Sequence, residues 1–195
     1  PRACKAGAQR LGSALEKHYP TKADWAGNKY IEVDLEWNYE DNVSVTSMKG
    51  YAKKALLQFK HGKPTKPYHS PSKHEPPSYG QRAQMAKQDL SAPMAAAEAA
   101  YLQQACGKLL CYARAADGAM LHALNGLASV QSNGAQQAMQ AMLHFLNYAA
   151  THPDAEKIYK ASGMILSIGS GAACLAAPQA RSRAGGLHYL GSKHG

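Results

Sequence analysis

Three acidic residues recur at every second position of one short segment: Glu32, Asp34 and Glu36. Side chains two positions apart on a β-strand lie on the same face, so a strand would gather these three carboxylates. Carboxylate oxygens are the ligands that hard divalent cations prefer, which makes a metal site one interpretation. The other interpretation is a charged face in contact with water, the usual role of such acids on an exposed hairpin.

The histidines and cysteines are the other candidate metal ligands. His61, His69 and His74 are eight and five residues apart, and this spacing matches no compact ligand pattern. Cys106 and Cys111 are five residues apart on a predicted helix, which places them on different faces and argues against a disulfide. Because no C-x-x-C is present, we expect free thiols and a reducing compartment.

Two catalytic motifs are missing from the sequence. It contains no G-x-S-x-G turn for a nucleophilic serine. It also lacks the G-x-x-x-x-G-K-[ST] loop that binds nucleotide phosphates. We therefore expect neither a serine hydrolase of this type nor a P-loop nucleotide hydrolase, and no bound cofactor.

Positive charge is concentrated in one part of the chain. The 195 residues carry a formal net charge of +9. Nine lysines and arginines lie between Lys49 and Lys87, whereas the first forty residues are nearly balanced. A basic segment favours a polyanionic partner, because neutralising phosphates releases counterions. The same charge could also serve only solubility.

Periodicity predicts an α+β protein that begins with a helix, a hairpin and a second helix. Residues 6–19 have helical spacing and stop at Pro20. Residues 30–37 alternate strictly, with Ile31, Val33, Leu35 and Trp37 on one side, and "EDN" turns the chain into a second strand over 43–48. A helix then follows over 49–61, whose predicted buried stripe is Tyr51, Ala55, Leu56 and Phe59.

The rest of the chain divides into a linker, helices and strands. Residues 62–94 are rich in Pro, Lys, His and Ser without apolar periodicity, which predicts an extended or disordered linker, or a segment lying on a partner. The sequence of residues 95–150 predicts three helices, and the sequence of residues 156–195 predicts short strands. The inner positions expected for the first and third of these helices are Leu102, Cys106, Leu109, Leu110 and Ala113, and Met139, Met142, Leu143, Leu146 and Ala150. No apolar run approaches the ~20 residues of a membrane span, so we expect no membrane partner.

Several motifs occur together in one order. The first is "HYPTKADWAGNKYIEVDLEWNYEDNVSVTSMKGY", with H-Y, D-W-x-G-x-K-Y, L-x-W-x-Y and S-M-x-G-Y elements. The second is "GKLLCYARAA", and "FLNYAATHPDA" and "ARSRAGG" follow. This series resembles the copia-type (Ty1/copia) retrotransposon polyprotein, from the reverse transcriptase thumb and connection into the RNase H-like domain. The resemblance covers nearly the whole chain.

The resemblance implies a division into four parts. Residues 1–61 would form the end of the palm and the thumb, 62–94 a linker, and 95–155 the helical connection. Residues 156–195 would form an incomplete RNase H-like sheet. The chain begins at Pro1 without Met and stops at Gly195, so we expect a fragment or a processed product.

Gly171 occupies the position at which the family's nuclease domain has its first aspartate. The family writes S-D-A-S-Y-L where this sequence reads "SGAACL" from Ser170 to Leu175. A nuclease of this type bridges two divalent cations with carboxylates, and glycine offers no side-chain oxygen. The polymerase acids would precede Pro1, and no D-D pair occurs in the sequence. The resemblance therefore implies a non-enzyme, with Mg²⁺ expected only in the intact parent protein.

Nucleic-acid binding is the function expected to remain. In reverse transcriptases the corresponding hairpin holds the primer strand, and the thumb helix follows its backbone. The residues expected to contact phosphate in RNA or an RNA–DNA hybrid are Lys49, Lys53, Lys54, Lys60, Arg181 and Arg183. A structural RNA-binding subunit of a larger ribonucleoprotein, with further protein partners, is the alternative. Both roles imply an intracellular location.

Overall fold

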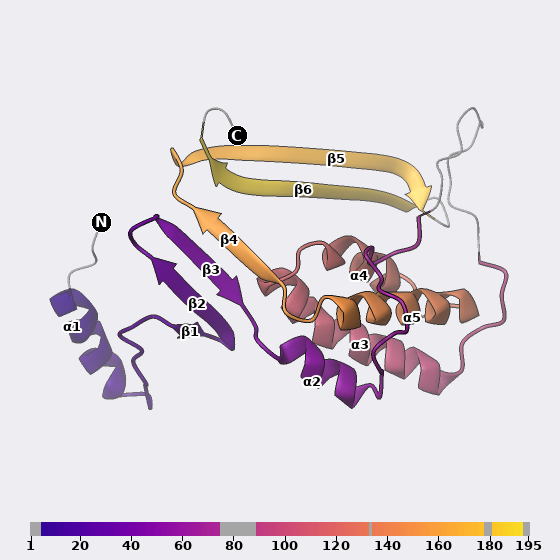
Figure 1. Cartoon of the computed structure of the whole chain (residues 1–195), viewed down its shortest axis with the longest axis horizontal. Coiled ribbons are helices and arrows are strands. Elements are labelled where there is room, and N and C mark those ends of the chain that lie inside the picture. Colours follow the sequence, from indigo (N-terminus) through magenta and orange to yellow (C-terminus); the bar gives the residue numbers. More distant parts are fainter. Residues whose placement is uncertain (1–4, 75–88, 133, 178–180, 193–195) are drawn as a thin grey trace.

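The computed structural model describes residues 5–74, 89–132, 134–177 and 181–192. In this part of the chain, five helices accompany one four-stranded and one two-stranded antiparallel sheet (Figure 1). The α+β class predicted from periodicity is therefore confirmed. Within the described residues, no helix combines the length and apolar character needed to cross a membrane.

The four-stranded sheet has the order β1-β2-β3-β4. It contains β1 (Lys29–Tyr30), β2 (Val33–Asn38), β3 (Val43–Ser47) and β4 (Glu156–Lys160). The predicted hairpin is confirmed, since β2 pairs antiparallel with β3.

The uninterrupted first strand predicted over 30–37 is wrong at Ile31. Ile31 and Glu32 have φ values of 47° and 64°, and β1 folds back on β2 through them. Two consecutive positive φ angles are typical of the tight turns whose twist suits a hairpin. Ile31 is 73% exposed as a result, instead of lying with Val33 and Leu35.

Strand β4 belongs to the same sheet as the hairpin. Its residues pair with β3 from Ser47↔Glu156 to Val43↔Lys160. The division into four parts made from the sequence placed residues 156–195, and thus β4, with the C-terminal strands. Local periodicity identifies a strand but carries no information on its neighbour, so this long-range pairing had no signal in the segment itself.

The hydrophobic core lies among four helices. These are α2 (Tyr51–Gln58), α3 (Ala96–Ala115), α4 (Met120–Ala128) and α5 (Gln136–Thr151). Their largest fully buried side chains are Tyr112, Phe145, Leu102, Leu109, Met120, Leu124, Met142 and Leu146. In contrast, α1 (Lys5–Glu16) buries none of its residues, and Figure 1 shows it beyond the sheet, at the far end from these helices.

The predicted helix faces are largely confirmed. Ala55, Leu56 and Phe59 are buried on α2. Leu110 and Leu143 depart from the prediction, because they are 37% and 47% exposed. Each is adjacent in sequence to a fully buried residue, so each lies about 100° round the helix from the centre of its buried face.

The first part of the predicted linker lies against α5. The backbone N–H of Tyr68 donates to Thr151 Oγ1 at 3.1 Å, and the Tyr68 ring meets the His144 ring edge-on at 4.9 Å. His144 Nε2 also lies 3.0 Å from the Ser70 carbonyl. Residues 62–74 form no helix or strand, and this part of the segment covers the protein's own helix. Residues 75–88 lie outside the described residues.

The described cysteines are free thiols, as predicted. Cys106 is buried, and its burial raises the pKa of the thiol to about 11. Cys111 is exposed on the same helix, which confirms that the two cysteines lie on different faces.

The last two described strands form a separate ribbon. β5 (Ile165–Ala177) pairs antiparallel with β6 (Arg181–Gly191), with an irregularity between Ala173 and Ala177. Figure 1 shows this ribbon running along one side of the molecule, beyond β4 and the helices. The two strands predicted within 165–186 are therefore confirmed, and residues 178–180 between them lie outside the described residues.

Candidate nucleic-acid interface

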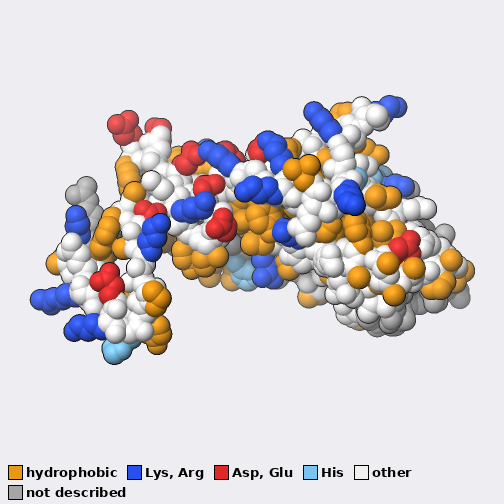
Figure 2. Space-filling view, turned by 90° about the horizontal axis from the view of Figure 1, so that it is seen from below, with side chains coloured by type: hydrophobic (Ala, Val, Ile, Leu, Met, Phe, Trp, Pro, Cys, Tyr) orange, Lys and Arg blue, Asp and Glu red, His pale blue; other side chains and the backbone are white. Residues whose placement is uncertain are grey.

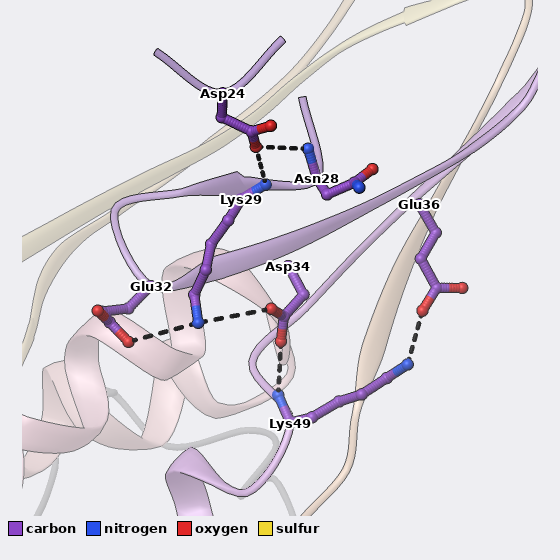
Figure 3. A network of polar contacts seen from close by, with 7 residues as sticks. All are labelled: Asp24, Asn28, Lys29, Glu32, Asp34, Glu36 and Lys49. Atoms are coloured by element: carbon purple, nitrogen blue, oxygen red, sulfur yellow. Dashed lines mark hydrogen bonds and ion pairs between the residues drawn. The ribbon is translucent and has the colours of Figure 1, made fainter. Parts of the chain in front are cut away.

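Lys49 is held by the acids of strand β2. Its ammonium lies 2.6 Å from Glu36 Oε1, and its backbone N–H donates to Asp34 Oδ2 at 3.4 Å (Figure 3). The hydrogen bond to Glu36, followed by the attraction of that carboxylate, raises the pKa of Lys49. The cation is therefore already neutralised within the sheet, which weakens it as a phosphate contact.

Lys53 is neutralised in the same way. Its ammonium lies 2.6 Å from Asp154 Oδ2, an ion pair that joins the first turn of α2 to the segment after α5. Exposed pairs of this kind contribute little to stability, so a phosphate could displace the carboxylate at small cost.

Lys54 and Lys60 are the predicted contacts that remain available. Both are exposed, and neither side chain has a hydrogen bond or ion pair with another described residue. Lys54 lies within α2, and Lys60 follows its last turn with a φ of 52°.

A small pocket of about 310 Å³ lies at the N-terminus of α2. Its lining residues are Ser47, Lys49, Gly50, Lys53, Asp154, Ala155 and Glu156. Ser47 Oγ is buried without a hydrogen-bond partner among the described residues. Because Asp154 and Glu156 balance the two lysines, the pocket lining has no excess positive charge to attract an anion.

The expected strand face of three acids is wrong at Glu32, which lies in the turn after β1 with a φ of 64°. Lys29 Nζ is 3.9 Å from both Glu32 Oε2 and Asp34 Oδ1 (Figure 3). Within the part of the chain that the structure describes, no three histidine, cysteine or acidic side chains are grouped to hold a metal. The three carboxylates instead contact the lysines Lys29 and Lys49.

The three histidines of the basic segment are not brought together. His61 Nε2 lies 2.9 Å from Asn147 Oδ1 on α5. The His69 ring lies 5.5 Å from the ring of His152. Each of these two histidines thus attaches the segment to α5.

Gly171 and the two arginines lie in the C-terminal ribbon. Gly171 of β5 pairs with Gly185 of β6, and a Cβ at Gly171 would meet no atom within 4 Å. Arg181 and Arg183 belong to β6, opposite Ala177 and Ala173. The side chains of these two arginines lie outside the described residues.

We expect Gly171→Asp to fold normally and to acquire no nuclease activity. The position has room for a carboxylate, and one carboxylate cannot bridge two cations. Cleavage of an RNA–DNA hybrid in Mg²⁺, measured beside unaltered protein, tests this expectation. Cleavage by the variant alone would mean that further metal-binding acids lie nearby, against the alignment of "SGAACL" with the nuclease motif.

Sequence reasoning missed the role of the loop before β1. The Asp24 carboxylate accepts hydrogen bonds from the backbone N–H groups of residues 26–29 (Figure 3 shows those of Asn28 and Lys29). These bonds, led by that of Lys29, lower the pKa of Asp24. Gly27 adopts a φ of 64°, and its carbonyl accepts a 2.8 Å hydrogen bond from Trp37 Nε1. The D-W-x-G spacing could have indicated this turn, because Asp and Gly favour such loops.

Comparison with known proteins adds no relative. No protein-family model, curated protein or solved structure matches this chain. The functional argument therefore depends on the residues themselves and on their arrangement.

Charges of both signs are interspersed over part of the surface. Figure 2 shows, on the face that it draws, lysine and arginine side chains lying among acidic ones over the middle of the molecule. This pattern agrees with the ion pairs of Lys29, Lys49 and Lys53. These pairs leave the net charge of +9 unchanged, because it already counts each acid against a base.

Proposed function

We propose that this chain is a non-catalytic part of a copia-type reverse transcriptase and RNase H polyprotein that binds RNA or an RNA–DNA hybrid through the phosphate backbone. On this proposal, the hairpin with α2 corresponds to the thumb, α3 to α5 to the connection, and the β5–β6 ribbon to the first strands of the nuclease domain. Backbone binding needs no metal or cofactor. The protein would be located inside the cell, where RNA and RNA–DNA hybrids occur.

The observation that carries the proposal is the exposed basic side of α2. Lys54 and Lys60 are free of ion pairs with described residues, and Lys53 lies beside Lys54 in an exposed pair that phosphate can replace. Phosphate contacts of this kind position a nucleic acid without reading its sequence.

The alternative role is a structural RNA-binding subunit of a larger ribonucleoprotein. In that role, the basic segment after α2 was expected to lie on the surface of a partner. Tyr68, His69 and Ser70 instead contact α5 of the same chain. That part of the alternative loses support. A stable stoichiometric complex of the chain with RNA and other proteins would restore it.

We expect the double variant Lys54→Ala/Lys60→Ala to weaken binding to an RNA–DNA hybrid and to reduce its salt dependence. Each lost phosphate contact lowers the slope of log K against log salt by about 0.9, so the pair should lower it by about two units. Fluorescence anisotropy of a labelled hybrid between roughly 50 and 200 mM salt measures both quantities.

The matched control is Lys5→Ala/Lys17→Ala, which removes the same charge at α1. This control should change the slope much less, because a contact acts locally and net charge acts at long range. Equal effects of the two double variants, or no binding by the unaltered protein at low salt, would contradict the proposal.

A further inference from the structure

The two faces of the four-stranded sheet differ in chemistry. Directly paired residues of antiparallel strands place their side chains on the same face. The pairs Lys29↔Asp34, Asp34↔Ser47 and Ser47↔Glu156 therefore define one face. Glu36 shares this face, so all the acids within the four strands lie on it.

The opposite face, called here the aromatic face, comprises Tyr30, Val33, Leu35, Trp37, Ser44, Thr46, Lys157 and Tyr159. Three of its aromatic side chains are open to solvent: Tyr30 is 66%, Trp37 48% and Tyr159 53% exposed. Trp37 and Tyr159 lie on the two strands that flank β3, so their exposed rings face solvent on the same side of the sheet.

The rings of the aromatic face are spaced around a small residue. Trp37 and Tyr159 both pair with Ser44, from either side. Because neighbouring strands lie about 4.8 Å apart, their backbones are about 10 Å apart, and only the serine side chain lies between them. Each ring can therefore present a flat surface to a separate planar group.

The Trp37 ring has a fixed orientation. Its Nε1 donates to the Gly27 carbonyl at 2.8 Å, in the loop that Asp24 holds in place. Its other contact is with Tyr39, whose ring is stacked at 6.3 Å and 12°. A ring held in this way loses little conformational entropy when a ligand stacks on it.

Positive charge borders the aromatic face at one end. Lys157 lies on this face, and its ammonium donates to the Arg114 carbonyl at the end of α3. Arg114 is itself exposed. The aromatic face contains no acid within the four strands, and its planar rings beside the cation Lys157 suit a strand of bases joined by phosphates.

We propose that the aromatic face binds single-stranded nucleic acid, with bases stacked on Trp37 and Tyr159 and the phosphates directed toward Lys157 and Arg114. This proposal rests on the proposed function and adds to its backbone contacts at α2 a separate surface for an unpaired strand. Stacking tolerates every base, because each has a π-face. In a duplex the bases are already stacked on one another and do not reach the rings.

The test uses Trp25→Phe, which leaves Trp37 as the single tryptophan of a chain that has two. The protein is titrated with oligo(U), with oligo(dT) and with an abasic oligonucleotide of equal length and charge. We expect both base-containing strands to quench Trp37 fluorescence and to bind about a hundredfold more tightly than the abasic strand, about tenfold for each of the two stacked bases.

A second variant separates stacking from folding. Tyr159→Thr keeps a strand-forming residue and should weaken oligo(U) binding about tenfold, with abasic binding unchanged. The control Tyr19→Ala removes an equally exposed ring outside the sheet and should change neither. Equal affinity for oligo(U) and the abasic strand would overturn stacking and leave backbone binding standing. Failure of all three strands to bind would overturn the present proposal, and the hybrid titration described above would then decide the backbone proposal by itself.

Discussion

Replacing Phe145 by alanine is expected to lower the free energy of unfolding by about 3–5 kcal/mol. Phe145 is 0% exposed in the middle of α5, within the core shared by α2, α3, α4 and α5. Removing its ring leaves a cavity that neighbouring helices can fill only in part, so a cavity cost adds to the lost hydrophobic transfer energy. Urea denaturation followed by circular dichroism measures the change.

Leu143→Ala is the matched control for this prediction. Leu143 lies two residues away on the same helix and is 47% exposed, so its truncation should cost well under half as much. Comparable losses for the two variants would mean that α5 does not present the Phe145 side to the core.

Replacing Tyr148 by phenylalanine is expected to lower the free energy of unfolding by about 1–3 kcal/mol. The Tyr148 hydroxyl donates to Asp117 Oδ2 at 3.1 Å, while the backbone N–H of Ala119 donates to Oδ1. Asp117 is only 7% exposed, so the variant leaves a buried carboxylate oxygen without its donor. The same denaturation measurement near pH 7 gives the value.

The same tyrosine predicts a loss of stability in alkali. Burial, and then the negative charge of Asp117, raise the pKa of Tyr148 to about 12. In the unfolded chain its pKa is near 10, so above that pH ionisation favours the unfolded state. The stabilisation is therefore complete below pH 10 and is lost as the pH rises toward 12, by about 2 kcal/mol.

Tyr148→Phe should remove this part of the alkaline loss. The difference in unfolding free energy between unaltered protein and variant is expected to shrink between pH 9 and pH 11. Tyr39→Phe is the control, because Tyr39 is 81% exposed and its removal should leave the profile unchanged. A pH-independent difference would show that Tyr148 titrates alike in the folded and unfolded states.

Local periodicity in the sequence was sufficient to predict a helix or strand where one face of that element is buried. The spacing of Ala55, Leu56 and Phe59 predicted the buried side of α2, and alternation predicted the β2–β3 hairpin. It failed at Ile31, because a tight turn formed by two non-glycine residues has no compositional signal.

The residues available for binding at the candidate site depend on contacts between distant segments of the chain. The spacing of residues within one segment does not predict such contacts. All four lysines of the basic helix region were expected to be equivalent. The structure separates them, because Lys53 meets Asp154 from the far end of α5, whereas Lys54 meets no described acid. The aromatic face was missed for a similar reason: Tyr159 joins Trp37 only through the pairing of β4 with β3.

That pairing also sets an order of events during synthesis. The hairpin leaves the ribosome before β4, because the strand that pairs with the open side of β3 begins roughly a hundred residues later. At a synthesis rate of about 5–20 residues per second, the N–H and C=O groups on that side of β3 remain unpaired for about 5–20 seconds. The nascent chain is therefore vulnerable to strand exchange with neighbouring copies on the same messenger until Lys160 has emerged.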